Sequence, residues 1–293
     1  MNDVQQANRE QATLWNGSAG NAWVEMQAVL DEVFQPLEQL LVDAVSARSG
    51  GLVLDVGCGT GATTLAIARA LEIRARCIGI DISDPMIAIA RTRAQQEGTG
   101  VEFINGDAQL HVFEPASLDM IVSRFGVMFF DDPVRAFTNL RRAAKDNAEL
   151  RFFTWRSPAE NPFMTTAERA AAPLLPDIPV RQPDAPGQFA FADRRRVNRI
   201  LEESGWTGID IRPVDIPCTF AETELVRYFT QLGPLGRVLQ DVDEPARVRI
   251  VETVRTAFNP YVHADAVRFN AACWMVSARP LPLSTESKET GNG

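Results

Sequence analysis

Short apolar runs alternate with amphipathic segments between residues 51 and 155. Each run has the length and composition of a buried parallel strand, and the intervening segments repeat apolar residues at helical spacing. The strands expected on this pattern are 52–56, 77–80, 101–104, 118–122 and 148–154. Five repeats of strand and helix predict a doubly wound α/β sheet, in which ligands bind at the carboxyl ends of the strands.

Local signals mark where helices begin and end. Two Asp-Pro pairs, at 84–85 and 132–133, each combine an N-cap acid with a proline at the first helical position. Asp193 is expected to cap a later helix, which Gly205 ends. Residues 222–258 predict two more helices, joined through Gly233-Pro234 and Gly236, and residues 209–214 and 267–278 predict strands.

The pattern also divides the chain into segments. Residues 156–190 are rich in proline, which indicates a lid or a substrate wall, and the C-terminal residues are polar. We expect a helical N-terminal cap segment, a ligand-binding core, a region of cap insertions with the last helix and strands of the core, and a disordered tail. Their respective bounds are 1–50, 51–155, 156–280 and 281–293.

Composition narrows the function. With 29 basic and 38 acidic residues the formal net charge is −9, which argues against nucleic acid as a partner. No apolar stretch approaches the ~20 residues of a membrane span, and no secretory signal is visible, so we expect a cytoplasmic protein without a membrane partner. The 4 cysteines and 2 histidines show no metal-like spacing, so no metal site is expected.

A glycine-rich turn follows the first strand, in the segment Asp55-Val-Gly-Cys-Gly-Thr-Gly61. Glycines here let a ligand approach the backbone closely. Gly57, Gly59 and Ala62 also satisfy the dinucleotide pattern, so an NAD-type site, or a purely structural turn, stays open at this point. Asp55 would repel a pyrophosphate and attract an ammonium group, which favours S-adenosylmethionine.

Two more acids end the next two strands. Asp81 lies where a carboxylate can accept both ribose hydroxyls of an adenosine, and Asp107 where one can accept from the adenine amino group. Met86, on the helix after Asp81, is a candidate for covering one face of the adenine, or for plain core. Acids at the ends of three successive strands indicate an adenosine-containing ligand more specifically together than any one of them does alone.

With these motifs the sequence resembles the class I S-adenosylmethionine-dependent methyltransferases, over residues 51–155. VLDVGCGTG is similar to the family's first motif, GIDIS to its ribose motif, NGDAQ to its adenine motif, and SRFGVMFFDDP to the segment after the fourth strand. The sequence is similar to the small-molecule enzymes of the ubiquinone and menaquinone biosynthesis group. The resemblance implies a Rossmann-like, mostly parallel seven-stranded sheet with an antiparallel last strand and a mainly helical cap.

The resemblance also implies which residues contact the cofactor, S-adenosylmethionine. These are Asp55, Gly57, Cys58, Gly59, Gly61, Asp81, Ile82, Met86, Gly106, Asp107, Ala108, Ser123 and Arg124. Trp15 and Trp23 are added because relatives often close an N-terminal aromatic segment over the cofactor, although two core tryptophans explain the pattern equally well.

The expected reaction is methyl transfer to a small-molecule acceptor by in-line displacement, carried out by a monomer or homodimer. Phe125, Met128 and Phe129 follow the fourth strand near the expected methyl group, and they favour an aromatic or lipophilic acceptor. Such a reaction needs no general base, and His263 is a weak candidate for one. A dinucleotide-dependent oxidoreductase and a cofactor-binding regulator without transfer activity are the alternatives.

Overall fold

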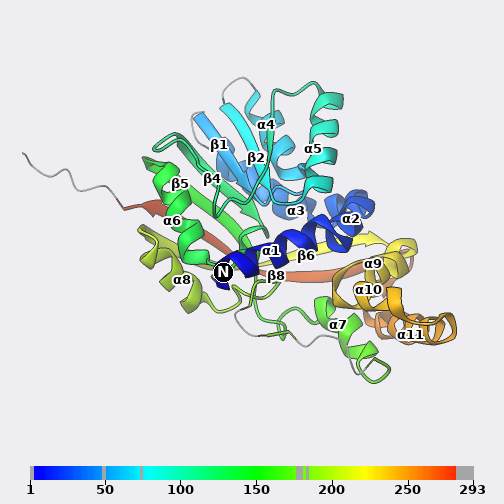
Figure 1. Cartoon of the computed structure of the whole chain (residues 1–293). Helices are drawn as coiled ribbons and strands as arrows, with labels where there is room; N and C mark the ends of the chain where they lie inside the picture. Colours follow the sequence, from blue (N-terminus) through cyan, green and yellow to red (C-terminus); the bar gives the residue numbers. More distant parts are fainter. Residues whose placement is uncertain (1–2, 48–50, 73–74, 176–180, 183–184, 282–293) are drawn as a thin grey trace, which may run out of the picture.

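The computed structural model describes residues 3–47, 51–72, 75–175, 181–182 and 185–281 (Figure 1). Most of the predicted tail, residues 282–293, and part of the proline-rich segment, residues 176–180 and 183–184, lie outside the described residues. No helix of the described chain is both long and apolar enough to cross a bilayer.

One mixed sheet organises the molecule. Its strands lie in the order β3-β2-β1-β4-β5-β8-β6, and the two-residue β7 pairs with β8 as an eighth strand. The pairs among β1 to β5 are parallel, and β8 runs antiparallel to both β5 and β6. The strands are β1 (Gly51–Val56), β2 (Ala75–Asp81), β3 (Glu102–Asn105), β4 (Leu118–Arg124), β5 (Ala144–Trp155), β6 (Trp206–Ala221), β7 (Val262–His263) and β8 (Ala266–Pro280).

The strand order reverses between β1 and β4, and this sets the place of the site. The chain steps outward from β1 to β3 through α4 (Ala62–Leu71) and α5 (Asp84–Glu97), then returns to β4 and continues through α6 (Pro133–Ala143). Right-handed crossovers that run in opposite directions put their helices on opposite faces of a sheet. A crevice therefore opens at the carboxyl ends of β1 and β4, as the doubly wound pattern predicts.

The cap comes from both ends of the chain. At the N-terminus lie α1 (Asp3–Asn16), α2 (Ser18–Glu25) and α3 (Gln27–Ser46), and α3 packs against α4. Beyond β5, α7 (Pro162–Ala171), α9 (Leu225–Gln231), α10 (Gly233–Val238) and α11 (Glu244–Ala257) gather beside one end of the long β6 and β8 (Figure 1). The remaining long helix, α8 (Arg194–Glu203), packs against α6 and β6.

The structure corrects several predicted elements. No helix separates β3 from β4, so the strand–helix alternation is incomplete. Ser83, not Asp84, is the N-cap of α5, because its hydroxyl accepts from the Met86 amide and Asp84 is already helical. Residues 222–258 form three α-helices, and Gly233-Pro234 opens α10 instead of linking two helices. The predicted strand 209–214 is the middle of the much longer β6.

Other start and stop signals are confirmed. The Asp132 carboxylate accepts from the Arg135 amide at the start of α6, and the Asp193 carboxylate accepts from the Arg195 amide at the start of α8. Gly205 follows α8 with a φ of +79°. These positions were predictable because caps depend on a few neighbouring residues and not on tertiary packing.

Candidate functional site

The glycine turn after β1 does two separate jobs. Gly57 has a φ of +67°, and a Cβ there would lie 2.5 Å from the Gly126 Cα, so this glycine lets the turn after β1 meet the turn after β4. Gly59 has a φ of +54°, and an added Cβ would meet only the Met86 sulfur, at 3.7 Å. The backbone at Gly59 therefore faces open space, as close approach of a ligand requires.

Asp81 connects that turn to the end of β2. Its Oδ2 accepts from the Gly59 amide at 2.8 Å and its Oδ1 from the Ser83 amide at 2.9 Å. Burial raises the pKa of Asp81, while the amide hydrogen bonds from Ser83 and Gly59 act in the opposite direction. The carboxylate is thereby held in one orientation at the cavity wall, with lone pairs left for a ligand.

A cavity of about 760 Å³ begins at these strand ends. Asp107 reaches it from the turn after β3, where its Oδ1 accepts from the Gln109 amide at 2.9 Å. Most of the predicted cofactor contacts line the cavity. They are Trp15, Trp23, Gly57, Gly59, Asp81, Ile82, Met86, Gly106, Asp107, Ala108 and Arg124.

Asp55 and Arg124 share a second, small cavity of about 40 Å³ beside the glycine turn. Asp55 is 2% exposed, and its Oδ2 accepts from the Thr64 hydroxyl at 2.7 Å. Its Oδ1 has no hydrogen-bond partner in the described structure. Burial raises the pKa of Asp55 to about 7, and burial also lowers the pKa of Arg124. A buried carboxylate with a free oxygen, close to a desolvated guanidinium, suits a ligand that carries both charges.

Besides Asp55, three predicted cofactor residues do not line the main cavity. Cys58 packs into a separate apolar cluster with Ile87 and Phe103, although it borders the small cavity. Ser123 is fully buried, and its hydroxyl donates to the Val56 carbonyl at 2.7 Å and accepts from the Gly126 amide at 3.1 Å. Gly61 caps α4 and would clash with Phe103 if it carried a Cβ. These three residues support the glycine turn and the end of β4 without facing the main cavity.

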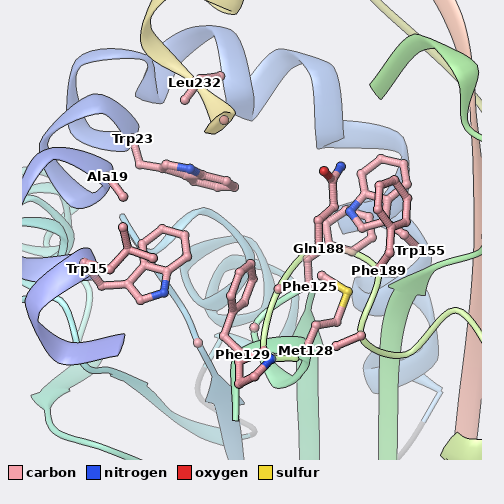
Figure 2. A pocket seen from close by; sticks show the side chains of 18 of the residues that line it. Trp15, Ala19, Trp23, Phe125, Met128, Phe129, Trp155, Gln188, Phe189 and Leu232 are labelled. Carbon is pink, nitrogen blue, oxygen red and sulfur yellow. The ribbon is translucent and has the colours of Figure 1, made fainter. Parts of the chain in front are cut away.

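Aromatic rings form two facing walls of the cavity (Figure 2). On one side Trp15 makes edge contacts with Phe129, at 4.9 Å between ring centroids, and with Trp23, at 6.0 Å. On the other side Phe125 stacks on Trp155 at 4.5 Å and an interplanar angle of 6°. All five rings line the cavity, so the two N-terminal tryptophans are wall residues and not plain core.

Phe125 holds an unusual backbone conformation. Its φ is +68°, which is rare for a bulky residue, and its amide donates to the Phe153 carbonyl at 3.2 Å. Left-handed φ values cost about 1–2 kcal/mol for residues other than glycine. In this conformation the Phe125 ring stacks on Trp155 at the cavity wall. Met128 and Phe129, the other two predicted substrate contacts, line the same cavity.

The N-terminal helices are fastened to the loop that carries Asp81. The Ser83 hydroxyl donates to the Trp15 carbonyl at 2.6 Å. The Asn16 side chain accepts from the Asp84 amide at 2.8 Å and donates to the Ile82 carbonyl at 3.1 Å. Trp15 is therefore positioned by the same loop that presents the expected ribose acceptor.

The cap supplies wall residues that the sequence did not single out. Gln188 and Phe189 lie in a loop fixed by the Gly187 amide, which donates to the Met128 carbonyl at 3.0 Å (Figure 2). Tyr228, on α9, donates to the Met164 sulfur at 3.5 Å, and burial raises its pKa. The clustering of aromatic residues between 220 and 261 was the signal available, but it does not say which rings meet the cavity.

The histidine considered as a base lies elsewhere. His263 is exposed in β7 and is not part of the cavity wall, because the β7–β8 turn carries it outward. We therefore do not propose it as a catalytic residue. Among the described residues, no group of three or more His, Cys, Asp or Glu side chains is arranged to hold a metal ion.

Comparisons with known proteins agree with this geometry. A family model described as a methyltransferase domain matches residues 53–147. A demethylmenaquinone methyltransferase of Renibacterium salmoninarum is 27% identical over 183 residues, which are 59% of this chain and 74% of that protein. The nocamycin O-methyltransferase of Saccharothrix syringae is 32% identical over 102 residues, 34% of this chain and 36% of that protein.

A solved structure shares the fold. The crystal structure of YcgJ from Bacillus subtilis has a TM-score of 0.56 at 16% identity, with 84% of this chain and 98% of that chain covered. The sequence matches favour a methyltransferase over the dinucleotide-dependent oxidoreductase that the glycine pattern alone left open. Residues 53–147 therefore form a methyltransferase domain, and the matches support a class I S-adenosylmethionine-dependent methyltransferase with S-adenosylmethionine as its cofactor.

Proposed function

We propose that this enzyme methylates an aromatic or lipophilic small molecule by in-line displacement within the cavity. The proposal rests on one observation: a single cavity of about 760 Å³ is lined both by the acids at the strand ends and by the two aromatic walls. Donor and acceptor can then lie in contact in one enclosed space. Two relatives are named for organic acceptors, demethylmenaquinone and nocamycin, which supports this class of substrate.

The residues present fit S-adenosylmethionine. The open face of Gly59 gives room for the ligand, and Asp81 offers lone pairs to the ribose hydroxyls. Asp107 would accept from the adenine amino group, and Met86 would cover the ring. The free Oδ1 of Asp55 suits the ammonium group, and Arg124 suits the carboxylate of the same methionine moiety.

When bound, the cofactor supplies a methyl group on a positively charged sulfur whose thioether is a good leaving group. The chain's own part is to orient the acceptor and exclude water. Positioning two reactants in contact can lower a barrier by about 7–11 kcal/mol. The faces of Trp15, Trp23 and Phe129 are also able to stabilise a nearby cation by cation–π attraction.

The predicted segments of the chain would have different roles. Residues 51–155 would bind the cofactor, while residues 1–50 and the insertions within 156–280 would enclose the acceptor. Elements from both cap segments line the cavity, including α2, α7 and α10. We propose that the cap sets acceptor choice.

Binding and turnover test the proposal separately. We expect S-adenosylhomocysteine, but not NAD, to bind in calorimetry, and labelled methyl groups to pass from S-adenosylmethionine to members of a panel of phenols, quinols and aromatic acids. Binding of NAD alone would contradict the cofactor. Binding of S-adenosylhomocysteine with no transfer to any acceptor would instead favour a regulator.

The ribose role of Asp81 has its own test. Asp81→Ala should weaken S-adenosylhomocysteine binding at least tenfold, about 1.4 kcal/mol, because two hydroxyl hydrogen bonds are lost. Since Asp81 also holds the Gly59 and Ser83 amides, the ligand's 2′,3′-dideoxy analogue is the control. The analogue should bind more weakly than its parent to the wild type and equally to the variant. An unchanged difference between the two ligands would refute the role.

A further inference from the structure

Three charged side chains meet in the cap, in a cavity whose other walls are mainly apolar. Glu168 extends from α7, Arg181 from the segment that follows it, and Arg237 from α10. All three line the cavity, and all three are partly buried. The three side chains carry two positive charges and one negative charge.

Two of these charges neutralise each other. The Arg181 guanidinium donates to both carboxylate oxygens of Glu168, with Nε to Oε2 at 3.0 Å, in the bidentate arrangement that makes such pairs strong. Arg181 also lies over the Phe189 ring, 5.0 Å from its centroid. This pair is fixed in position and forms part of the wall.

Arg237 is the third of these charged side chains, and it does not take part in the pair. Within the described part of the chain its guanidinium makes no hydrogen bond and no ion pair. Burial lowers the pKa of Arg237, Glu168 attracts its charge, and Arg181 repels it. A partly desolvated guanidinium without a hydrogen-bonding partner is unfavourable, and an anionic group placed against it removes that penalty.

We propose that Arg237 binds a carboxylate of the acceptor, so that the substrate is an aromatic or lipophilic acid anchored by its charge. This rests on the proposed function and names the substrate class for the same cavity. The planar guanidinium matches a carboxylate in two parallel hydrogen bonds, which a neutral acceptor cannot make equally well. Glu168, already paired with Arg181, would not compete for it.

The anchor belongs to the cap and not to the cofactor end of the site. Asp81, Asp107 and Gly59 lie at the carboxyl ends of the sheet strands, whereas Arg237 lies in α10, beside α7 and α9. A substrate held at Arg237 would extend between the aromatic walls and present a different atom to the methyl group. The carboxylate therefore acts as a handle and is not the group that is methylated.

Binding of a matched pair of probes tests the anchor without turnover. In the presence of saturating S-adenosylhomocysteine, 2-naphthoate should bind the wild type at least tenfold more tightly than neutral 2-naphthamide, measured by tryptophan fluorescence and calorimetry. Arg237→Gln should lower the affinity for naphthoate at least tenfold and change that for naphthamide less than twofold. Arg237→Lys, which keeps the charge, should retain part of the preference.

Controls separate the anchor from general effects. Arg249→Gln removes an exposed arginine of α11 and should leave both affinities unchanged. S-adenosylhomocysteine binding should be equal in all four proteins, and its failure in the wild type would contradict the cofactor instead of the anchor. Equal affinity of the wild type for the two probes, no binding of naphthoate at millimolar concentration, or equal loss of both probes in Arg237→Gln would overturn the proposal.

Discussion

Asp55 is the buried acid that we propose binds the ammonium group of the cofactor. Its carboxylate is almost completely buried, and only one of its oxygens has a partner, the Thr64 hydroxyl. Desolvation is the main cause of its raised pKa, the nearby charges of Asp81 and Glu38 raise it further, and Arg124 acts against them. The ionised carboxylate is unfavourable in this buried position, and an ammonium group bound beside it would offset that cost.

The same carboxylate should make stability depend on pH. The pKa of Asp55 is about 7 in the folded chain against an ordinary value of 3.8. Between these values the folded state binds a proton that the unfolded state has released, so stability is lost as pH rises from about 4 to 7. Asp55→Asn removes this loss. Urea unfolding of the cofactor-free protein should be measured at several pH values. The free energy of unfolding of the variant, relative to that of the wild type, should rise with pH up to pH ~7, by at most ~1.4 kcal/mol per pH unit. Above pH ~7 this difference should stay constant.

An exposed acid gives the matched control. Asp241→Asn, in the short helical turn after α10, should follow the wild-type curve at every pH. Parallel curves for Asp55→Asn and the wild type would contradict the raised pKa of Asp55. Affinity for S-adenosylhomocysteine should change in the opposite sense, rising with pH through 7 in the wild type and staying flat in Asp55→Asn.

At the scale of elements, the turns after β1 and β4 are in close backbone contact at the carboxyl ends of these strands. The turn after β1 touches the turn after β4 through Gly57 and Gly126, where an added Cβ on Gly57 would lie 2.5 Å from a backbone atom. A backbone contact cannot be relieved by a side-chain rotation. The relative position of β1 and β4 at their carboxyl ends therefore depends on this glycine.

Two glycines with nearly equal φ values test this contact. Gly98, which ends α5, has a φ of +64° and nothing within 4 Å of an added Cβ. Gly98→Ala should lower the free energy of unfolding by about 1–2 kcal/mol, the conformational penalty alone, and leave cofactor binding unchanged. Gly57→Ala should cost more and should also weaken S-adenosylhomocysteine binding, because the turns must separate. Equal losses of stability, with cofactor binding intact in both variants, would show that the turns are not coupled.

At the scale of elements, the features that the sequence predicts are those that depend on neighbouring residues or on the direction of the strands. Asp81 and Asp107 could be placed together because the carboxyl ends of parallel strands share one edge of a sheet. Cys58 and Ser123 could not be separated from their neighbours in the same motifs, since successive residues of a turn or strand point in different directions. Cys58 turns into the core beside Phe103, and Ser123 bonds the Val56 carbonyl.

At the scale of the whole molecule, the part of the cavity that we propose holds the acceptor was harder to predict than the strand ends. Its walls come from α1 and α2 at one end of the sequence and from α7, α9 and α10 near the other. Whether Gln188 or Arg237 faces the cavity depends on how these helices fold back over the sheet, a tertiary outcome with no local signature. Tertiary packing also extends β6 far beyond its predicted bounds, because β8 pairs with it along almost its entire length.

The long β6 leaves the molecule with an exposed sheet edge. It is the terminal strand of the sheet path, and unpaired edges favour association with another chain. Pro213 and Pro217 lie two positions either side of Asp215, and prolines in an edge strand remove outward N–H donors. Charged side chains along the same strand add to this protection.

The prolines should therefore prevent association of two molecules through this edge. We expect the double variant Pro213→Thr and Pro217→Thr to self-associate at concentrations where the wild type does not change its state, as measured by sedimentation velocity. Pro245→Thr, at an exposed position in α11, is the control and should sediment as the wild type does. If the double variant also sedimented unchanged, the charges and twist of β6 would suffice without the prolines. A wild-type dimer would then have to form through another surface, because an edge that resists pairing cannot supply its interface.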